Sequence, residues 1–191
     1  MSIADRWDAI YADASEPRPA SEFVTNHAEL LVGCPTAIDL AGGTGGTALW
    51  LSAQGISTTL VEISERALGI ARDAAAERGL QLLTRNADLE AHRLPTARDL
   101  GREQGWTAAV CSNFLHRPLL DWLDHLLVPG GLAFVQIATV DNLLINARPG
   151  RKYLVKRGEL PDLCSGLETV SFEEGWFAGR HEARLVARRP G

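Results

Sequence analysis

The stretch Ala37-Ile-Asp-Leu-Ala-Gly-Gly-Thr-Gly45 joins a short apolar run to a cluster of glycines. Residues 37–41 have the composition of a buried parallel strand, and the glycines let the backbone turn tightly where a Cβ would clash with a ligand. A second apolar run, 58–63, carries Glu62 twenty residues after Gly42. This spacing fits one β-α-β unit, which brings the glycines and the carboxylate to one edge of a sheet. Because a carboxylate can accept strong hydrogen bonds from both ribose hydroxyls, the stretch predicts a nucleoside-cofactor site.

Two classes of cofactor use this arrangement. The pattern Gly43-x-Gly45-x-x-Ala48, with Glu62 as the ribose acid, agrees with the loose dinucleotide fingerprint, so an NAD(P)-dependent oxidoreductase is one alternative. Asp39 is harder to reconcile with it, because a purely structural buried strand rarely carries an unpaired acid. A dehydrogenase also normally needs a second, substrate-binding domain, for which 191 residues leave no room.

Length and composition predict one cytoplasmic domain, 1–191. An apolar content of 46% suits a domain of this size, which buries roughly 70% of its unfolded surface. The net charge of −5 argues against a nucleic-acid partner. Three widely spaced cysteines give neither a disulfide framework nor a metal knuckle, the histidines show no metal spacing, and no segment is long and apolar enough to enter a membrane. We therefore expect a soluble protein, a monomer or homodimer, with no metal and a small-molecule substrate.

Alternating strand and helix patterns predict a doubly wound, three-layer α/β fold. Residues 1–36 are expected to form a helical lid, with helices at 4–12 and 20–32, and residues 37–191 a Rossmann-like core. Five strands are expected at 37–41, 58–63, 80–85, 107–112 and 132–138. Helices are expected at 47–54, 64–78, 96–104 and 118–127, a tight turn at 128–131, and a final hairpin of 167–174 and 180–188 around 175–179.

Six motifs together resemble a known family. The string Ile38–Gly45 resembles motif I of the class I S-adenosylmethionine (SAM)-dependent methyltransferases. The tellurite-resistance and thiopurine methyltransferase-like branch is suggested by the further motifs Trp7-Asp-Ala-Ile-Tyr11, Val61-Glu-Ile-Ser64, Asn86-Ala-Asp-Leu89, Asn113-Phe-Leu-His-Arg-Pro118 and Val128-Pro-Gly-Gly131. The resemblance implies a seven-stranded, mostly parallel sheet with a C-terminal antiparallel hairpin, SAM as cofactor, and a small, soft or anionic methyl acceptor. One departure is Trp106-Thr107, which stands where the family has an aromatic residue and an acid. A SAM-binding protein without catalytic activity is a further alternative.

The resemblance also implies roles for individual residues. Asp39 would place the methionine amino group, Glu62 would hold the ribose and Asp88 the adenine amine. The full set of cofactor-binding residues would be Asp39, Ala41, Gly42, Gly43, Gly45, Glu62, Ile63, Asp88, Leu89 and Ser112. Two of these assignments have alternatives: Asp39 as a cap for the glycine loop and Asp88 as an exposed loop residue.

Three residues after the fourth strand are candidates for the acceptor chemistry, because the transferable methyl should lie at that edge. They are Asn113, His116 as a base or an orienting donor, and Arg117 as an anion clamp. His116 has the alternative of a simple turn residue before the helix at Pro118. Trp7 and Tyr11 would close over the cofactor or pack in the core. The basic residues of 148–157 would form a flap over an anionic acceptor or a solvated loop.

Overall fold

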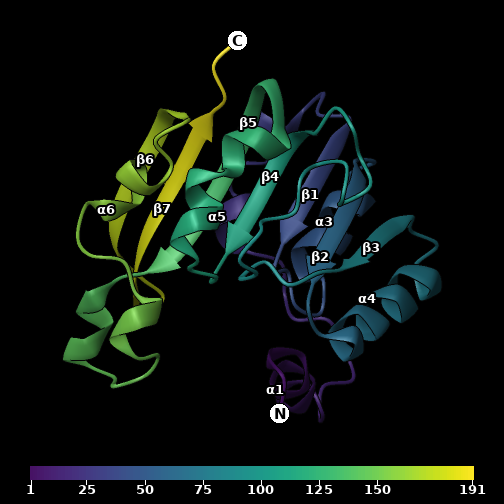
Figure 1. Ribbon diagram of the computed structural model, residues 1–191, viewed down its shortest axis with the longest axis horizontal. Coiled ribbons are helices and arrows are strands. Elements are labelled where there is room, and N and C mark those ends of the chain that lie inside the picture. Colours follow the sequence, from purple (N-terminus) through teal and green to yellow (C-terminus); the bar gives the residue numbers. More distant parts are fainter.

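The computed structural model describes residues 1–191 and contains one seven-stranded sheet in the order β3-β2-β1-β4-β5-β7-β6 (Figure 1). Strands β1 to β5 pair in parallel, and β7 pairs antiparallel with both β5 and β6. The strands are β1 Thr36–Leu40, β2 Ser57–Glu62, β3 Leu82–Asn86, β4 Trp106–Ser112, β5 Leu127–Ala138, β6 Glu168–Phe177 and β7 Arg180–Arg188. The predicted fold class is confirmed.

Helices lie on both sides of the sheet, as the predicted three-layer fold requires. They are α1 Ile3–Ile10, α2 Glu22–Thr25, α3 Gly46–Ala53, α4 Glu65–Glu77, α5 Arg117–Asp121 and α6 Glu159–Leu163. Short 3-10 helices span Ala28–Leu31, Leu123–Leu126, Val140–Leu144 and Arg151–Tyr153. No helix combines the length and apolarity needed to cross a membrane.

Local sequence signals explain the helix that follows the second strand. The Ser64 hydroxyl accepts a hydrogen bond from the Ala67 N–H at 3.1 Å and so caps α4. Gly79, at φ +65°, lies just past its end. The cap fixes where α4 begins, directly after the carboxyl end of β2, and thereby places Glu62 beside a helix N-terminus.

The hydrophobic core occupies both faces of the sheet. The larger cluster includes Leu119 and Leu160 from the helices on one face, and the smaller one includes Phe23 and Leu51 on the other. All five residues of β1 are buried, because this strand lies between β2 and β4 and is covered on both faces. Burial raises the pKa of the Cys111 and Cys164 thiols, that of Cys164 to about 12.

Three predicted helices are shorter than expected or missing. The range 20–32 holds only α2 and one 3-10 turn, and 118–127 holds α5 and a second 3-10 turn, with β5 starting at Leu127. The range 96–104 is not helical. Thr96 and Asp99 cap each other reciprocally, but Gly101 adopts φ +96° and ends the structure after a single turn.

Two turns also differ from prediction. The range 128–131 is not a separate turn but lies within β5, where Leu127 pairs with Trp106 and Leu132 with Ala108, so the residues between them bulge out of the ladder. In the final hairpin β6 extends to Phe177, beyond the expected end at 174, whereas β7 has the expected bounds; the turn consists of Ala178 and Gly179 alone, both with positive φ. A two-residue turn of this kind matches the natural twist of the strands.

Candidate functional site

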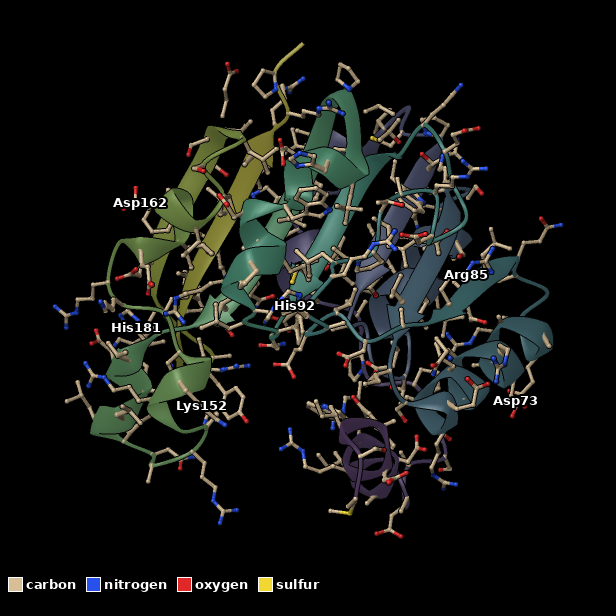
Figure 2. All side chains as sticks on the ribbon, in the orientation of Figure 1. Asp73, Arg85, His92, Lys152, Asp162 and His181 are labelled. Atoms are coloured by element: carbon tan, nitrogen blue, oxygen red, sulfur yellow. The ribbon has the colours of Figure 1, made fainter.

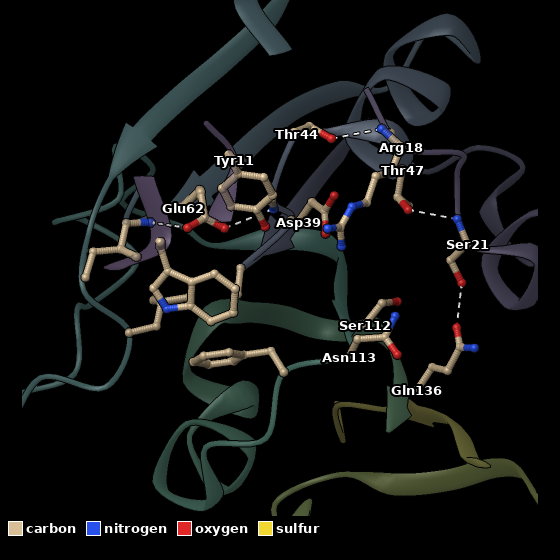
Figure 3. A pocket seen from close by; sticks show the side chains of 18 of the residues that line it. Tyr11, Arg18, Ser21, Asp39, Thr44, Thr47, Glu62, Ser112, Asn113 and Gln136 are labelled. Atoms are coloured by element: carbon tan, nitrogen blue, oxygen red, sulfur yellow. Dashed lines mark hydrogen bonds between the residues drawn. The ribbon is translucent and has the colours of Figure 1, made fainter. Parts of the chain in front are cut away.

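A cavity of about 350 Å³ lies at the carboxyl ends of β1, β2 and β4 (Figure 3). The strand order reverses between β1 and β4, and in open α/β sheets ligands bind at such switch points. The volume falls within the range of roughly 300–1,000 Å³ typical of small-ligand sites. The cavity is therefore the candidate functional site.

The cavity brings together nearly all of the predicted cofactor residues. Those that line it are Asp39, Ala41, Gly42, Gly43, Glu62, Ile63, Asp88, Leu89 and Ser112. Gly45 does not line it. A Cβ on Gly45 would lie 2.8 Å from the Ala71 Cβ, so this glycine allows the loop to pack against α4. Asp88 faces the cavity while its Oδ1 also accepts the Glu90 N–H at 2.8 Å.

Two glycines of the loop leave no room for a side chain. A Cβ on Gly42 would lie 2.5 Å from both the Asp39 Oδ2 and the Leu60 Cδ1. Gly43 adopts φ +57°, and a Cβ there would lie 2.7 Å from the Tyr11 hydroxyl. These contacts explain why both positions are glycine, because only a residue without a Cβ lets the loop pack this closely against Asp39 and Tyr11 at the cavity wall.

Glu62 is almost fully buried and is held by three backbone amides. Its Oε2 accepts the Gly43 N–H at 3.0 Å, and its Oε1 accepts those of Ile63 at 2.8 Å and Ser64 at 3.0 Å. The carboxylate thus ties the glycine loop to the start of α4 in addition to lining the cavity. The sequence analysis missed this structural role, although the position of Glu62 two residues before the helix cap was a signal for it.

Two buried oxygen atoms of the cavity residues have no hydrogen-bond partner, namely Asp39 Oδ2 and Ser112 Oγ. Asp39 is 2% exposed. Burial raises its pKa to about 7, the backbone N–H of Ala48 opposes the rise, and the negative charge of Glu62 adds to it. Buried polar atoms are nearly always paired, so these two indicate where a ligand with hydrogen-bonding groups would bind.

Helix α1 lies over the cavity through Trp7 and Tyr11, whose stacked rings are 6.2 Å apart. Two contacts hold the helix there. The Asp8 Oδ1 accepts a hydrogen bond from the Ser64 hydroxyl at 2.5 Å, and the Arg66 guanidinium donates to the carbonyl oxygen of Tyr11 at 2.6 Å. The two cavity-facing rings, one on α1 and one on the residue that caps its end, are therefore tied to the start of α4.

The chain between α1 and α2 runs across the glycine loop, and we call residues 15–21 the N-terminal strap. The Thr44 hydroxyl oxygen accepts the Arg18 N–H at 2.8 Å, and the Thr47 hydroxyl oxygen accepts the Ser21 N–H at 3.0 Å (Figure 3). A Cβ on Gly46 would lie 1.9 Å from the Arg18 carbonyl oxygen. Only a glycine at position 46 therefore lets the strap pass this close to the loop. Arg18 also lines the cavity, a position that the sequence analysis missed.

His116 and Arg117 lie outside the cavity, in contrast to Asn113, which lines it. After Asn113, which adopts φ +62°, the chain turns away. His116 becomes the N-cap residue of α5, and Arg117 pairs with both carboxylate oxygens of Glu159 at 2.9 and 3.1 Å. The prediction that these two residues stand beside the reacting groups is not supported by their positions.

Residues of β5 and β7 supply a polar side of the cavity that the sequence analysis missed. Gln136 accepts a hydrogen bond from the Ser21 hydroxyl at 2.7 Å and donates one to the buried Glu182 carboxylate at 2.6 Å. Arg180 also lines the cavity, with its guanidinium 3.7 Å from Glu182. No motif pointed to these residues, because only the pairing of the C-terminal hairpin with β5 places them here.

A second cavity of about 280 Å³ adjoins the first. Five residues line both: Trp7, Glu90, Asn113, Phe114 and Arg180. From the predicted basic flap, Pro149 and Tyr153 reach this cavity. Lys152 lies over the Tyr153 ring, 4.7 Å from its centroid. Arg157 instead forms an ion pair with Asp141 at 2.7 Å, so part of the basic run has a structural partner.

Comparisons with known proteins agree with this architecture. The structure described as "Conversion of a Disulfide Bond into a Thioacetal Group during Echinomycin Biosynthesis" is 21% identical with a TM-score of 0.77, covering 98% of this chain and 93% of that one. TehB from Haemophilus influenzae is 17% identical with a TM-score of 0.73, covering 97% of this chain and 66% of that one. Magnesium protoporphyrin IX methyltransferase from Synechocystis PCC 6803, with bound S-adenosylhomocysteine (SAH), is 18% identical with a TM-score of 0.63, covering 97% and 93%. At these identities the likeness concerns the fold.

A family assignment comes from the sequence itself. No curated protein matches the sequence. Residues 37–131 match the family described as methyltransferase domain. This range contains the glycine loop, Glu62 and Ser112, and so includes most of the predicted cofactor residues that line the first cavity. The chain thus contains a methyltransferase domain, and this family implies S-adenosylmethionine as the cofactor.

Proposed function

We propose that the chain transfers a methyl group from SAM, bound in the first cavity, to a small-molecule acceptor that is soft or anionic. The observation that carries the proposal is the pair of unpartnered buried oxygens, Asp39 Oδ2 and Ser112 Oγ, whose residues line the same cavity as the glycine loop. SAM carries an ammonium group and ribose hydroxyls that can pair with such acceptors. Tellurite and thiopurines are the acceptor types suggested by the motifs.

The methionine end of SAM would lie between Asp39 and Arg18. Ionised Asp39 would accept hydrogen bonds from the ammonium group. Arg18 lines the same cavity, makes no ion pair with an acid, and lies with its guanidinium 5.5 Å from the Tyr11 ring centroid. It would bind the carboxylate of the methionine moiety, since guanidinium and carboxylate have matching hydrogen-bond geometry.

The nucleoside end would lie toward β2 and β3. A carboxylate has about four lone-pair sites, and three of those on Glu62 already accept backbone hydrogen bonds. Glu62 can therefore accept a further hydrogen bond from a ribose. Asp88 would accept from the adenine amine through the oxygen that does not bond Glu90. Ile63 and Leu89 would contact the faces of the base.

The chemistry asks little of the side chains. Bound SAM supplies an electrophilic methyl on a sulfonium. The chain contributes alignment, because holding two reactants in a near-attack geometry supplies much of the acceleration in transfers of this kind. Asn113 and Phe114 line both cavities and would orient the acceptor where they meet. Residues 1–36, through Trp7 and the strap, would close over the cofactor as a lid.

Ligand binding tests the cofactor assignment against the dinucleotide alternative. SAH at one hundred times its dissociation constant should stabilise the protein by about 2.7 kcal/mol and raise its melting temperature, whereas NAD at the same concentration should not. Adenosine, which lacks the methionine moiety, is the matched control and should give a smaller rise. Stabilisation by NAD without stabilisation by SAH would contradict the proposal.

Replacement of Glu62 by alanine should weaken SAH binding by roughly 10- to 150-fold, the equivalent of about 1.5 to 3 kcal/mol for a hydrogen bond to a charged group. The variant should also lose stability, because three backbone N–H groups lose their acceptor. Glu62→Gln should not restore the site, since the amide nitrogen would face backbone donors. Isothermal calorimetry and denaturant unfolding measure the two effects.

The exposed Glu77 at the C-terminal end of α4 provides the control. Glu77→Ala should leave both the SAH affinity and the stability close to those of the wild type. Wild-type affinity in folded Glu62→Ala would leave Glu62 with only its structural role.

A further inference from the structure

The second cavity opens on the first at the residues proposed to meet the transferable methyl. Asn113 and Phe114 follow β4 directly and line both spaces, as does Trp7 from α1. A molecule in the second cavity would therefore lie next to the methyl group of SAM bound in the first. The inference below rests on the proposed function and concerns the chemical class of the acceptor.

The walls of the second cavity are largely apolar. The apolar residues come from four parts of the chain: α1, the segment after β4, the end of β5, and the segment before α6. The apolar contributors are Trp7, Ile10, Phe114, Leu115, Ile137, Ala138, Pro149 and Tyr153. A small hydrated oxyanion would lose its water against such walls without gaining partners for most of its surface, which is unfavourable. An apolar, ring-containing body would instead replace water along them.

Positive charge stands at the same cavity. Arg6 and Arg180 line it, and Glu90 is the one acid that does. Arg6 has no acid within 4.0 Å and lies against Trp7, 6.0 Å from its ring centroid.

The acid that faces Arg180 is Glu182, whose carboxylate also binds Arg184 and Gln136. The Oε1 of Glu182 lies 3.7 Å from Arg180, but its Oε2 is already bound by Arg184 at 3.0 Å and Gln136 at 2.6 Å. Arg184 also lies 3.7 Å from Glu173, on the solvent side of the hairpin. The Arg180 guanidinium is thus incompletely neutralised and keeps donors free for an anion.

A third cation is associated with this cavity. Lys152 lies 4.7 Å from the ring centroid of Tyr153. Its hydrogen bond to the phenol is the main cause of a lowered Tyr153 pKa, and Arg6 contributes in the same direction. The cationic side of the cavity therefore extends from α1 to the basic segment.

We propose that the second cavity binds the methyl acceptor and selects a ring-containing apolar molecule bearing a carboxylate, which Arg180 binds with support from Arg6. In the transfer, a lone pair of the acceptor forms the new bond to the methyl carbon while the carbon–sulfur bond breaks and its electron pair stays on sulfur, giving SAH. A thiol or phenol acceptor loses its proton to water. Bare oxyanions such as tellurite are poor occupants of this cavity.

The test compares three probes on the full chain saturated with SAH: 4-methylbenzoate, its neutral counterpart 4-methylbenzamide, and tellurite. Titration calorimetry should give an affinity at least tenfold higher for the benzoate than for the benzamide, and weaker binding for tellurite. Arg180→Gln should reduce the benzoate preference to within threefold. Benzamide binding equal to or tighter than benzoate binding, or tellurite binding tighter than both, would overturn the proposal.

Two further variants keep the test decisive. Arg6 lies on α1, which has no buried residues, so the Arg6→Gln variant should fold even if the Arg180→Gln variant does not. The Arg6→Gln variant should lower the benzoate affinity by a few fold. Lys156→Gln is the control, because Lys156 is exposed on the same basic segment and lines neither cavity. It should keep the full preference. An unchanged benzoate preference in both arginine variants would reject the arginines as the anion site.

Turnover separates this proposal from the proposed function. With SAM as donor, 4-mercaptobenzoate should be methylated with a higher kcat/KM than 4-methylbenzenethiol, the difference lying mainly in KM. Absence of SAH binding in the same protein would count against the proposed function, whereas SAH binding without a preference for the acids would count against the acceptor class alone.

Discussion

The Asp39→Asn variant should be more stable than the wild-type protein above pH 7 while binding SAH more weakly. In the folded protein without ligand, burial raises the Asp39 pKa from 3.8 to about 7. The folded state thus binds the proton more tightly than the unfolded state. The protonated Asp39 carboxyl therefore contributes to the stability of the folded state. This contribution is fully present below pH 3.8 and is lost as the pH rises through 7. At 1.36 kcal/mol per pH unit, the loss is about 4 kcal/mol. Asparagine stays neutral and avoids this loss.

Denaturant unfolding without ligand at pH 5 and pH 8 measures this effect. The difference in stability between the variant and the wild type should increase toward pH 8. Asp73→Asn on the exposed side of α4 is the control and should show no such pH dependence (Figure 2). The affinity for SAH should fall at pH 8, because the neutral amide cannot pair with the ammonium as an ionised carboxylate does. A pH-independent stability difference would show that Asp39 is ionised and paired before the cofactor binds.

The second large effect is expected from Gly46→Ala. The added Cβ would lie 1.9 Å from the carbonyl oxygen of Arg18, a backbone atom that cannot rotate away. Gly46 does not adopt a positive φ, so the penalty comes from the clash alone. We expect the N-terminal strap to leave the glycine loop, stability to fall by about 1 to 3 kcal/mol or more, and SAH affinity to fall by at least tenfold.

Gly69→Ala is the matched control for this substitution. Gly69 lies inside α4, and a Cβ there would meet nothing within 4 Å. Alanine is the better helix former, so this variant should gain about 0.4–1 kcal/mol of stability and keep its cofactor affinity. Thermal unfolding and calorimetry on both variants measure the contrast. Equal stability and equal SAH affinity in the two alanine variants would mean that the strap can remain in place with a side chain at position 46.

The meeting of the glycine loop, Asp39 and Glu62 at one cavity could be predicted because it depends on local patterns. The apolar runs of β1 and β2 and the glycines between them specify a β-α-β unit, and the parallel pairing of those strands brings Asp39 and Glu62 to one edge. The same patterns could not assign each glycine. Gly45 and Gly46 are adjacent, but one faces Ala71 of α4 and the other faces Arg18 of the strap. Both partners are distant in the sequence.

The positions of the residues that follow Asn113 and of those on β7 could not be predicted, for two physical reasons. The first is the direction of the chain after β4. Asn113 adopts φ +62° and the chain then turns away, so His116 and Arg117 line neither cavity although they lie close to Asn113 in the sequence. The second is strand pairing. Arg180 and Glu182 reach the cavity because β7 lies between β5 and β6 in the sheet. This pairing joins strands that are distant in the sequence, and the alternation of polar and apolar residues does not specify it.

The attachment of α1 has a kinetic consequence. This helix has no buried residue of its own and is held by polar contacts of Asp8 and Arg66, which can break without disturbing the hydrophobic core. Opening of α1 is therefore inexpensive, and its Trp7 side chain lines the cavity. Under this arrangement the residence time of SAH depends on how often α1 detaches, and release of SAH, not transfer of the methyl group, would limit the rate of repeated turnover.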